Sequence, residues 1–329
     1  MPTSTITRKI GDSTFPGIGF GVLDAAHAAG ATFWDTADIC GDSEELLGKW
    51  HAYLPSHFRD CWLTNSSEFR FKRTGKHGDI FLASKFGFTS SNDIDGSPGY
   101  VTKATESSLK KLSVDYIDLY YLHRADVKVP IEHTVAALAE FVKAGKIKHI
   151  GLSEVSAETL RCAHAVHPIA ALQVEYSPFT LDIEDPKIGL SVTARELGIQ
   201  VVAYSPLGRG FLTGQYKSPD DFEEGDFCKG IPRYSAQNFP NILKLADGLK
   251  SVGAKYGGAT TGQVALAWLL AQGEDIIPIP ENIAASKLKL SAEDVKAVRN
   301  VASQADASQG ERYPAGMLMT LLVDTPALS

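Results

Sequence analysis

Short apolar runs, rich in β-branched and aromatic residues, alternate along the chain with segments of helical periodicity. A strand that is buried on both faces is apolar throughout, and helices between such strands indicate a parallel sheet. The pattern predicts strands at 32–35, 80–85, 116–122, 147–152, 171–174, 200–204 and 276–279. It predicts helices near 44–50, 101–112, 131–144, 157–166, 188–197, 242–256 and 262–271.

Residues typical of helix ends support these boundaries. Gly145 and Gly198 each follow a predicted helix, where glycine readily adopts the left-handed conformation that ends it. Ser156 precedes another helix as an N-cap. The polar stretch 214–240 is too long for an ordinary connection, so we expect it to cross the mouth of the fold as a lid-like excursion.

The order of these elements favours an α/β fold of the (β/α)8 TIM barrel type, formed by residues 1–329 as a single domain. A chain of 329 residues is within the size of one such barrel. A doubly wound open sheet is the alternative, but its GxGxxG fingerprint after the first strand is absent.

Three predicted strands end in ionisable residues, which are Asp35, Lys85 and His123. Because the carboxyl ends of barrel strands form one rim, we expect this acid, amine and imidazole to meet there. A buried Lys85 would pair with Asp35, since a lone buried ammonium is costly. Such a trio polarises a carbonyl or moves a proton, so the chain is predicted to be an enzyme.

Composition and charge limit the binding partners and the cellular location that we expect for this chain. With 44% hydrophobic residues and a net charge of −7, the chain is an ordinary globular protein without the basic face that nucleic acids or anionic membranes require, although a local basic pocket is allowed. Its start is polar, and no run approaches the roughly 20 apolar residues that span a bilayer, which favours a cytoplasmic protein. The four cysteines lack metal-ligand spacing and fit free thiols.

Eight segments together resemble the aldo-keto reductase superfamily, in particular its YakC-like or pyridoxal-reductase-like branch. The match extends over about four fifths of the chain, and its segments occur in one consistent order: FWDTAD (33–38), GDSEELLGKW (41–50), IFLASKFGF (80–88), VDYIDLYYLHR (114–124), GKIKHIGLSEVS (145–156), ALQVEYSPF (171–179), VVAYSPLGRGFLTG (201–214) and GERYPAGM (310–317). The resemblance implies a TIM barrel that reduces aldehydes and ketones with a nicotinamide cofactor, usually NADPH, and without a metal.

The same resemblance implies a catalytic tetrad of Asp, Tyr, Lys and His. Asp35, Lys85 and His123 match three of its members, but the tyrosine, five residues after the aspartate, is replaced by Cys40. A thiol is a weak donor and is shorter than a phenol, so we expect weakened proton donation, partly recovered by His123 or a held water. A thiol whose pKa is lowered beside Lys85, acting as nucleophile or redox sensor, is an alternative.

For the cofactor, the resemblance implies that Tyr204 stacks on the nicotinamide ring while Ser153 and Gln173 bind its carboxamide. Ser205, Leu207, Gly208 and Gly210 belong to a turn whose free backbone amides would approach the pyrophosphate. Glu281 and Asn282 resemble the adenine-contacting pair, but about nine residues that bind the 2′-phosphate in relatives are absent before them. The resemblance implies NADP as the cofactor, while the missing residues leave NAD, or weakened binding, as the alternative.

Two further departures concern loops. The first βα loop is shortened where 19–21 run straight into 22–26, and residues 51–70 form an inserted loop, either native or a gene-model error. Phe179, Trp34 and Tyr313 are candidates for the substrate wall. Two functions stay open: reduction of a small-molecule carbonyl, weakened by Cys40, or a catalytically silent nucleotide-binding relative that acts as a sensor or partner subunit. The oligomeric state and the particular substrate are not predicted.

Overall fold

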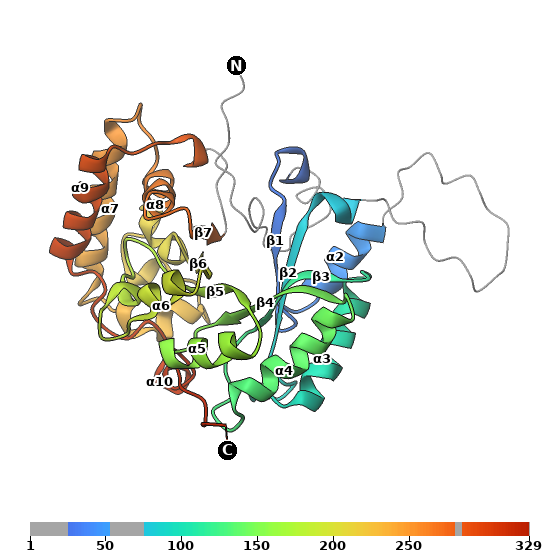
Figure 1. The fold of residues 1–329 in the computed structure, drawn as a ribbon. Coiled ribbons are helices and arrows are strands. Elements are labelled where there is room, and N and C mark those ends of the chain that lie inside the picture. The colour runs from blue at the N-terminus through green and yellow to red at the C-terminus, as the bar shows by residue number, and fades with distance from the viewer. Residues whose placement is uncertain (1–25, 53–75, 280–284, 329) are drawn as a thin grey trace.

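A computed structural model describes residues 26–52, 76–279 and 285–328. Its centre is one sheet of seven parallel strands in sequential order (Figure 1). The strands are β1 (Phe33–Asp35), β2 (Phe81–Phe86), β3 (Ile117–Leu122), β4 (Ile147–Ser153), β5 (Ile169–Glu175), β6 (Gln200–Tyr204) and β7 (Ile276–Ile279). All seven predicted strands are confirmed, with ends shifted by at most two residues.

Helices form an outer layer around this sheet (Figure 1). They are α2 (Ser43–Ala52), α3 (Pro98–Lys111), α4 (Ile131–Lys143), α5 (Ala157–Val166), α6 (Leu190–Glu196), α7 (Phe239–Ala254), α8 (Thr261–Leu270), α9 (Ala292–Ala305) and α10 (Ala315–Leu318). The seven predicted helices are present, and Ser156 caps α5 by accepting a hydrogen bond from the Thr159 amide. The pattern missed α9 and α10, although Ser291 caps α9 in the same way.

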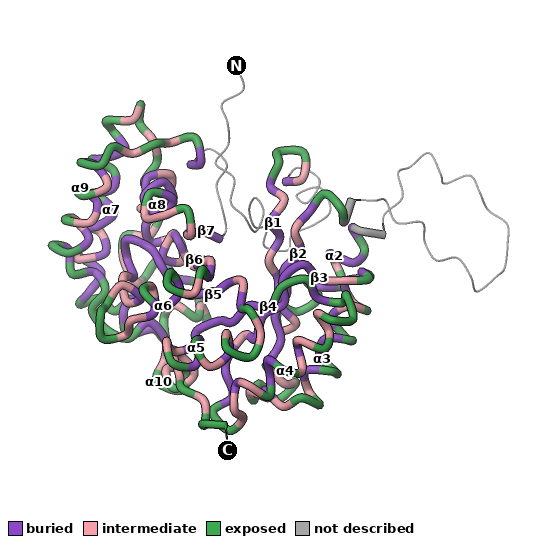
Figure 2. The backbone as a smooth tube through the Cα atoms, viewed as in Figure 1, coloured by how far each residue is buried: buried purple, intermediate pink, exposed green. Residues whose placement is uncertain are grey.

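Two apolar clusters hold the barrel together, one on each face of the sheet. Figure 2 shows that the buried residues are concentrated along the strands and on the sides of the helices that face them. A small inner layer fills the barrel and consists of Phe33, Ala83, Leu119, Tyr121, Ala171, Val202, Ile277 and Ile279. A larger outer layer packs the alternate strand residues, such as Trp34 and Tyr120, against the helices. Because successive strand side chains face opposite ways, each strand contributes to both layers.

The inner layer depends on one close approach between β3 and β4. The Tyr121 ring lies directly against Gly151, where an added Cβ would fall 2.4 Å from a ring carbon. Only glycine leaves this space, since 2.4 Å is far inside van der Waals contact. The ring consequently lies inside the barrel, one residue before the end of β3.

The predicted excursion at 214–240 is a series of 3-10 turns, Pro219–Asp221, Phe227–Gly230 and Pro232–Tyr234. It is anchored by buried aromatic residues, and Tyr234 stacks on Phe211 with ring centroids 4.1 Å apart. Residues 51 and 52, the first of the predicted insertion, continue α2. The rest of that insertion and the predicted shortened first loop lie outside the described residues.

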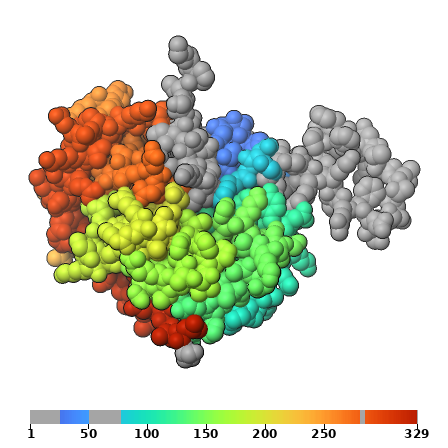
Figure 3. Space-filling view, viewed as in Figure 1, coloured from blue at the N-terminus to red at the C-terminus, as the bar shows by residue number. Residues whose placement is uncertain are grey.

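The last residues of the chain return to the middle of the sheet, where Val323 pairs with Val155 just after β4. The space-filling view shows this C-terminal segment against the segments from the middle of the chain (Figure 3). The end of β4 near residue 153 is therefore covered by the C-terminal segment.

None of the helices in the described ranges is both long and apolar enough to cross a membrane.

Candidate active site

Asp35 and Lys85 end adjacent strands and form a buried ion pair. Lys85 Nζ hydrogen-bonds to the Asp35 carboxylate and donates to the Thr36 carbonyl oxygen at 2.8 Å. The two side chains are only 6% and 7% exposed, so each charge depends on the other for compensation. The predicted pairing of Lys85 with Asp35 is confirmed.

His123 follows β3 and faces the same space. Burial, reinforced by the positive charges of Lys85 and Arg124, holds the pKa of the His123 imidazole well below its ordinary value. The ring is therefore neutral at neutral pH. The Nδ1 atom of His123 is buried without a hydrogen-bond partner. The Phe88 ring lies edge-on to the imidazole, with the two ring centroids 5.2 Å apart. A neutral imidazole with a free ring nitrogen is suited to hydrogen bonding with a ligand.

Cys40 lies in the turn between β1 and α2, at the edge of the same space. Although the residue is exposed, the protein around the thiol removes water from it and thereby raises its pKa. The charge of Lys85 opposes this rise but does not overcome it, and Asp35 and Asp38 add to it. The predicted alternative of a thiol with a lowered pKa is therefore wrong, because desolvation outweighs the lysine.

These side chains surround one pocket of about 380 Å³ at the carboxyl ends of the strands. Eight of the predicted site residues line it: Asp35, Cys40, Lys85, His123, Ser153, Gln173, Tyr204 and Ser205. Ala37, Arg124, Arg209, Ile279 and Tyr313 complete the wall. Arg124 and Arg209 were not predicted, since neither is the residue in which a predicted apolar strand ends, the feature that identified Asp35, Lys85 and His123.

Gln173 and Ser153 lie side by side at the ends of β5 and β4. Gln173 Nε2 donates to Asp35 Oδ2 at 2.9 Å, and the Ser153 hydroxyl accepts from Arg124 at 3.3 Å. The amide and the hydroxyl thus already take part in the polar network around Lys85. Both also face the pocket, where a planar amide of a ligand would meet them.

Tyr204 is fixed by a buried network that the sequence analysis missed. Its hydroxyl donates to Glu154 Oε1 at 2.7 Å, and Arg312 binds both oxygens of Glu154 at 2.9 and 2.7 Å. Burial works against the charge of Glu154, but Arg312 lowers its pKa overall and keeps it ionised. Two features of the sequence could have pointed to this network: Glu154 directly follows a predicted strand, and Arg312 lies within the segment 310–317 that carries the family resemblance.

The turn after β6 differs in part from its prediction. Gly208 and Gly210 have φ of 54° and 95°, conformations that favour glycine, as expected. Their amides, however, donate to the Ser205 and Leu207 carbonyls within the turn. These two amides are therefore not free, because the tight turn satisfies its own backbone. The Leu207 side chain packs toward Gly262 at the start of α8 rather than lining the pocket.

Only Tyr313 of the three substrate-wall candidates lines the pocket. Trp34 is fully buried on the outer face of β1, where its ring lies 4.5 Å from that of Trp50. Phe179 is 2% exposed and stacks on Tyr234 beneath the excursion. Both predictions are wrong, because strand alternation turned Trp34 outward and the excursion covered Phe179.

Two predicted residues, Glu281 and Asn282, lie outside the described residues. Within the described ranges, no group of three or more His, Cys, Asp or Glu side chains is arranged to hold a metal ion.

The fold and the pocket define a parallel α/β barrel with a polar site at the carboxyl ends of its strands, the usual place of barrel active sites. Residues 20–306 match the model of the aldo/keto reductase family. The chain belongs to that family.

Similar sequences support the family, and a similar solved structure supports the fold. The chain is 52% identical to aldo-keto reductase str7 of Strobilurus tenacellus and 44% identical to aldo-keto reductase yakc [NADP(+)] of Schizosaccharomyces pombe, with 98% of each chain covered in both cases. It is similar to the structure of glycerol dehydrogenase AKR11B4 from Gluconobacter oxydans, with a TM-score of 0.75, 24% identity and coverage of 93% of this chain and 97% of that one. The predicted (β/α)8 fold and family are confirmed.

Proposed function

We propose that this protein reduces an aldehyde or ketone to the alcohol with NADPH, in the cytoplasm, at a rate limited by Cys40. The observation that carries the proposal is the meeting of the Asp35–Lys85 pair and the neutral His123 in one pocket. Membership of the family supports carbonyl reduction in general. The name of the yakc relative, which includes NADP(+), supports the choice of nucleotide.

The pocket fits a nicotinamide nucleotide. The Tyr204 ring, held through its hydroxyl by Glu154, offers a fixed aromatic face, while Gln173 and Ser153 offer an amide and a hydroxyl for a carboxamide. The His123 Nδ1 and Arg209 Nε atoms are buried and without partners, as expected of groups that await a ligand. When bound, the reduced nicotinamide supplies the hydride.

The protein's own contribution is to orient the carbonyl and to supply a proton. His123 hydrogen-bonds the carbonyl oxygen, and the positive field of Lys85 stabilises the negative charge that develops on it. The proton donor is the weak point, because the Cys40 thiol is a poor donor and shorter than a phenol. Losing a positioned acid typically lowers a rate by about 10² to 10⁴.

Cys40 also favours a second candidate, a catalytically silent relative that binds the nucleotide as a sensor or partner subunit. In such a relative, Asp35, Lys85 and His123 would contribute to nucleotide binding and not to catalysis. NAD is an alternative nucleotide, since the basic residues that select the 2′-phosphate in relatives have no counterpart after Pro280.

Fluorescence titration with NADPH and NADH tests the proposal. We expect saturable binding of at least one nucleotide below millimolar concentration, followed by oxidation of the bound nucleotide when a reactive aldehyde is added. Binding without any turnover would select the silent relative. Absence of binding of both nucleotides would reject both candidates.

A further inference from the structure

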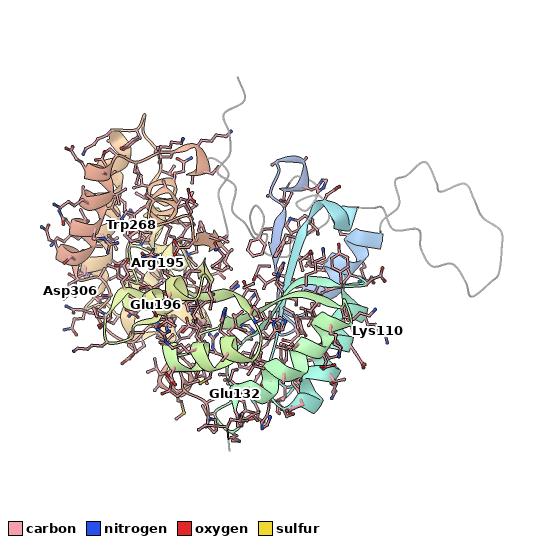
Figure 4. The ribbon with its side chains drawn as sticks, viewed as in Figure 1. Lys110, Glu132, Arg195, Glu196, Trp268 and Asp306 are labelled. Carbon is pink, nitrogen blue, oxygen red and sulfur yellow. The ribbon has the colours of Figure 1, made fainter. Side chains whose placement is uncertain are left out.

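The Tyr121 hydroxyl is a buried donor without an acceptor. Tyr121 is fully buried on the inner face of β3, and no hydrogen bond joins its hydroxyl to any of the described residues. Figure 4 shows side chains crowding the region around the strands. The neighbouring Tyr120, equally buried but on the outer face, shares a hydrogen bond of 3.0 Å with Ser108. Because a buried hydroxyl is normally satisfied, the isolation of Tyr121 calls for an explanation.

Tyr121 lies beside the Asp35–Lys85 pair. It is in register with Lys85 on the adjacent strand, and Lys85 Nζ lies 5.8 Å from the centroid of the Tyr121 ring. Burial raises the pKa of the Tyr121 hydroxyl, the negative charge of Asp35 raises it further, and Gln173 opposes the rise. Asp35 and Gln173 are therefore the polar neighbours of this hydroxyl, which stays protonated at neutral pH and remains a donor.

Asp35 depends on Gln173 for one of its hydrogen bonds. Lys85 binds the Oδ1 atom, whereas Oδ2 accepts from Gln173 Nε2 at 2.9 Å and from no other residue in the described ranges. Gln173 also lines the pocket, where the nicotinamide carboxamide is proposed to bind it. A Gln173 amide that turned to the nucleotide would leave Oδ2 as a buried acceptor without a donor, which is unfavourable.

We propose that Tyr121 is a positioning residue, a reserve donor that hydrogen-bonds Asp35 Oδ2 when the Gln173 amide leaves it for the nucleotide. In the free protein, Gln173 holds Asp35 and the Tyr121 hydroxyl has no partner. In the complex, Gln173 holds the carboxamide and Tyr121 holds Asp35, so the carboxylate keeps its orientation toward Lys85. The inference rests on the proposed function for the identity of the ligand, but the exchange between the two donors can be tested without it.

A double-mutant cycle in the free protein tests this exchange. Gln173→Met removes the amide donor, and Gln173→Leu provides a second background in case the first is poorly folded. Thermal unfolding is measured for Tyr121→Phe alone and in each background. Tyr120→Phe, which removes a hydroxyl of the same kind on the other face of the sheet, is the matched control.

We expect the effect of Tyr121→Phe to change sign within this cycle. Alone, the substitution removes an unsatisfied hydroxyl and should leave the melting temperature unchanged or raise it. In Gln173→Met, where Tyr121 is the remaining donor to Asp35 Oδ2, it should lower the melting temperature by about 2–4 °C. Tyr120→Phe should lower it equally in both backgrounds. Additive effects of Tyr121→Phe and Gln173→Met would overturn the proposal.

Nucleotide affinity gives a second readout, which a purely structural role would not change. Because the reserve donor acts only in the complex, the Kd for NADPH should rise about 5- to 10-fold in Tyr121→Phe and stay unchanged in Tyr120→Phe. An unchanged Kd in Tyr121→Phe would overturn the proposal. If the parent protein binds no NADPH, the reductase proposal fails, whereas a change of sign in the cycle supports Tyr121 as the reserve donor.

Discussion

At the scale of single residues, the site is governed by which buried charges have partners. Asp35 and Lys85 form a buried ion pair in which each charge compensates the other. Burial, reinforced by the charges of Lys85 and Arg124, lowers the pKa of His123 and keeps its ring neutral. Asp38, two residues before Cys40, differs from the Asp35–Lys85 pair, because its Oδ1 is buried without a hydrogen-bond partner.

Removing one member of the ion pair should therefore destabilise the fold. We predict that Lys85→Met lowers the free energy of unfolding by about 3–5 kcal/mol, because it leaves Asp35 buried without compensation. The double variant Lys85→Met, Asp35→Leu should recover much of that loss. Urea denaturation checks both values, and equal stability of the single variant and the parent protein would contradict the account of the pair.

Asp38 should make stability depend on pH. Burial, and then the charge of Glu44, raise its pKa to about 7, compared with 3.8 in the unfolded chain. Between these values the folded state holds a proton that the unfolded state has lost, so this group's contribution to stability falls as pH rises from about 4 to 7. We predict that Asp38→Asn raises the melting temperature at pH 8 relative to the parent, and much less at pH 4.5. A constant difference across that range would refute this assignment.

At the scale of elements, the strands were predictable and some contacts between them were not. Largely apolar runs defined β2 and β3 within two residues, because burial on both faces favours apolar side chains. The buried polar residues in these strands have partners: Asp118 accepts from the Leu82 amide, and Ser84 donates to Glu44. The orientation of Trp34 depended on strand phase, which a three-residue β1 leaves ambiguous in sequence. The hydrogen bonds that occupy the Gly208 and Gly210 amides depend on backbone angles that residue types alone do not specify.

The packing of β3 on β4 gives a prediction at this scale. Gly151→Ala should destabilise the protein by about 1–3 kcal/mol, since the new methyl group would overlap the Tyr121 ring in a filled barrel. The same change in a Tyr121→Leu background should cost much less. A double-mutant cycle by urea denaturation measures the coupling, and additive effects would show that the ring does not restrict residue 151.

At the scale of the whole molecule, the C-terminal segment completes the mouth of the barrel. Arg312 binds Glu154 and also approaches Glu175 at 3.4 Å, so one cation from the C-terminal segment lies against two buried acids, one directly after β4 and one at the end of β5. Sequence reasoning missed the pairing of Arg312 with Glu154, because it joins positions 158 residues apart. The pairing also explains how Tyr204, which donates to Glu154, keeps a fixed orientation.

Breaking this pairing should affect stability and the nucleotide site together. We predict that Arg312→Leu lowers the free energy of unfolding by about 3–5 kcal/mol, since Glu154 and Glu175 remain buried without their cation. Adding Glu154→Gln should restore part of that loss. Weaker NADPH binding in the folded single variant would follow from a loosened Tyr204. An unchanged unfolding midpoint would contradict the role assigned to Arg312.

We propose that an otherwise assembled reductase site lacks a strong proton donor at Cys40. Turnover of an aldehyde by Cys40→Tyr, compared with Cys40→Phe and the parent protein at saturating nucleotide, tests it most directly. We predict a gain of at least ~10² for tyrosine and none for phenylalanine, which has a similar ring but no hydroxyl. Equal turnover of all three proteins, with nucleotide bound, would contradict it and favour the catalytically silent relative.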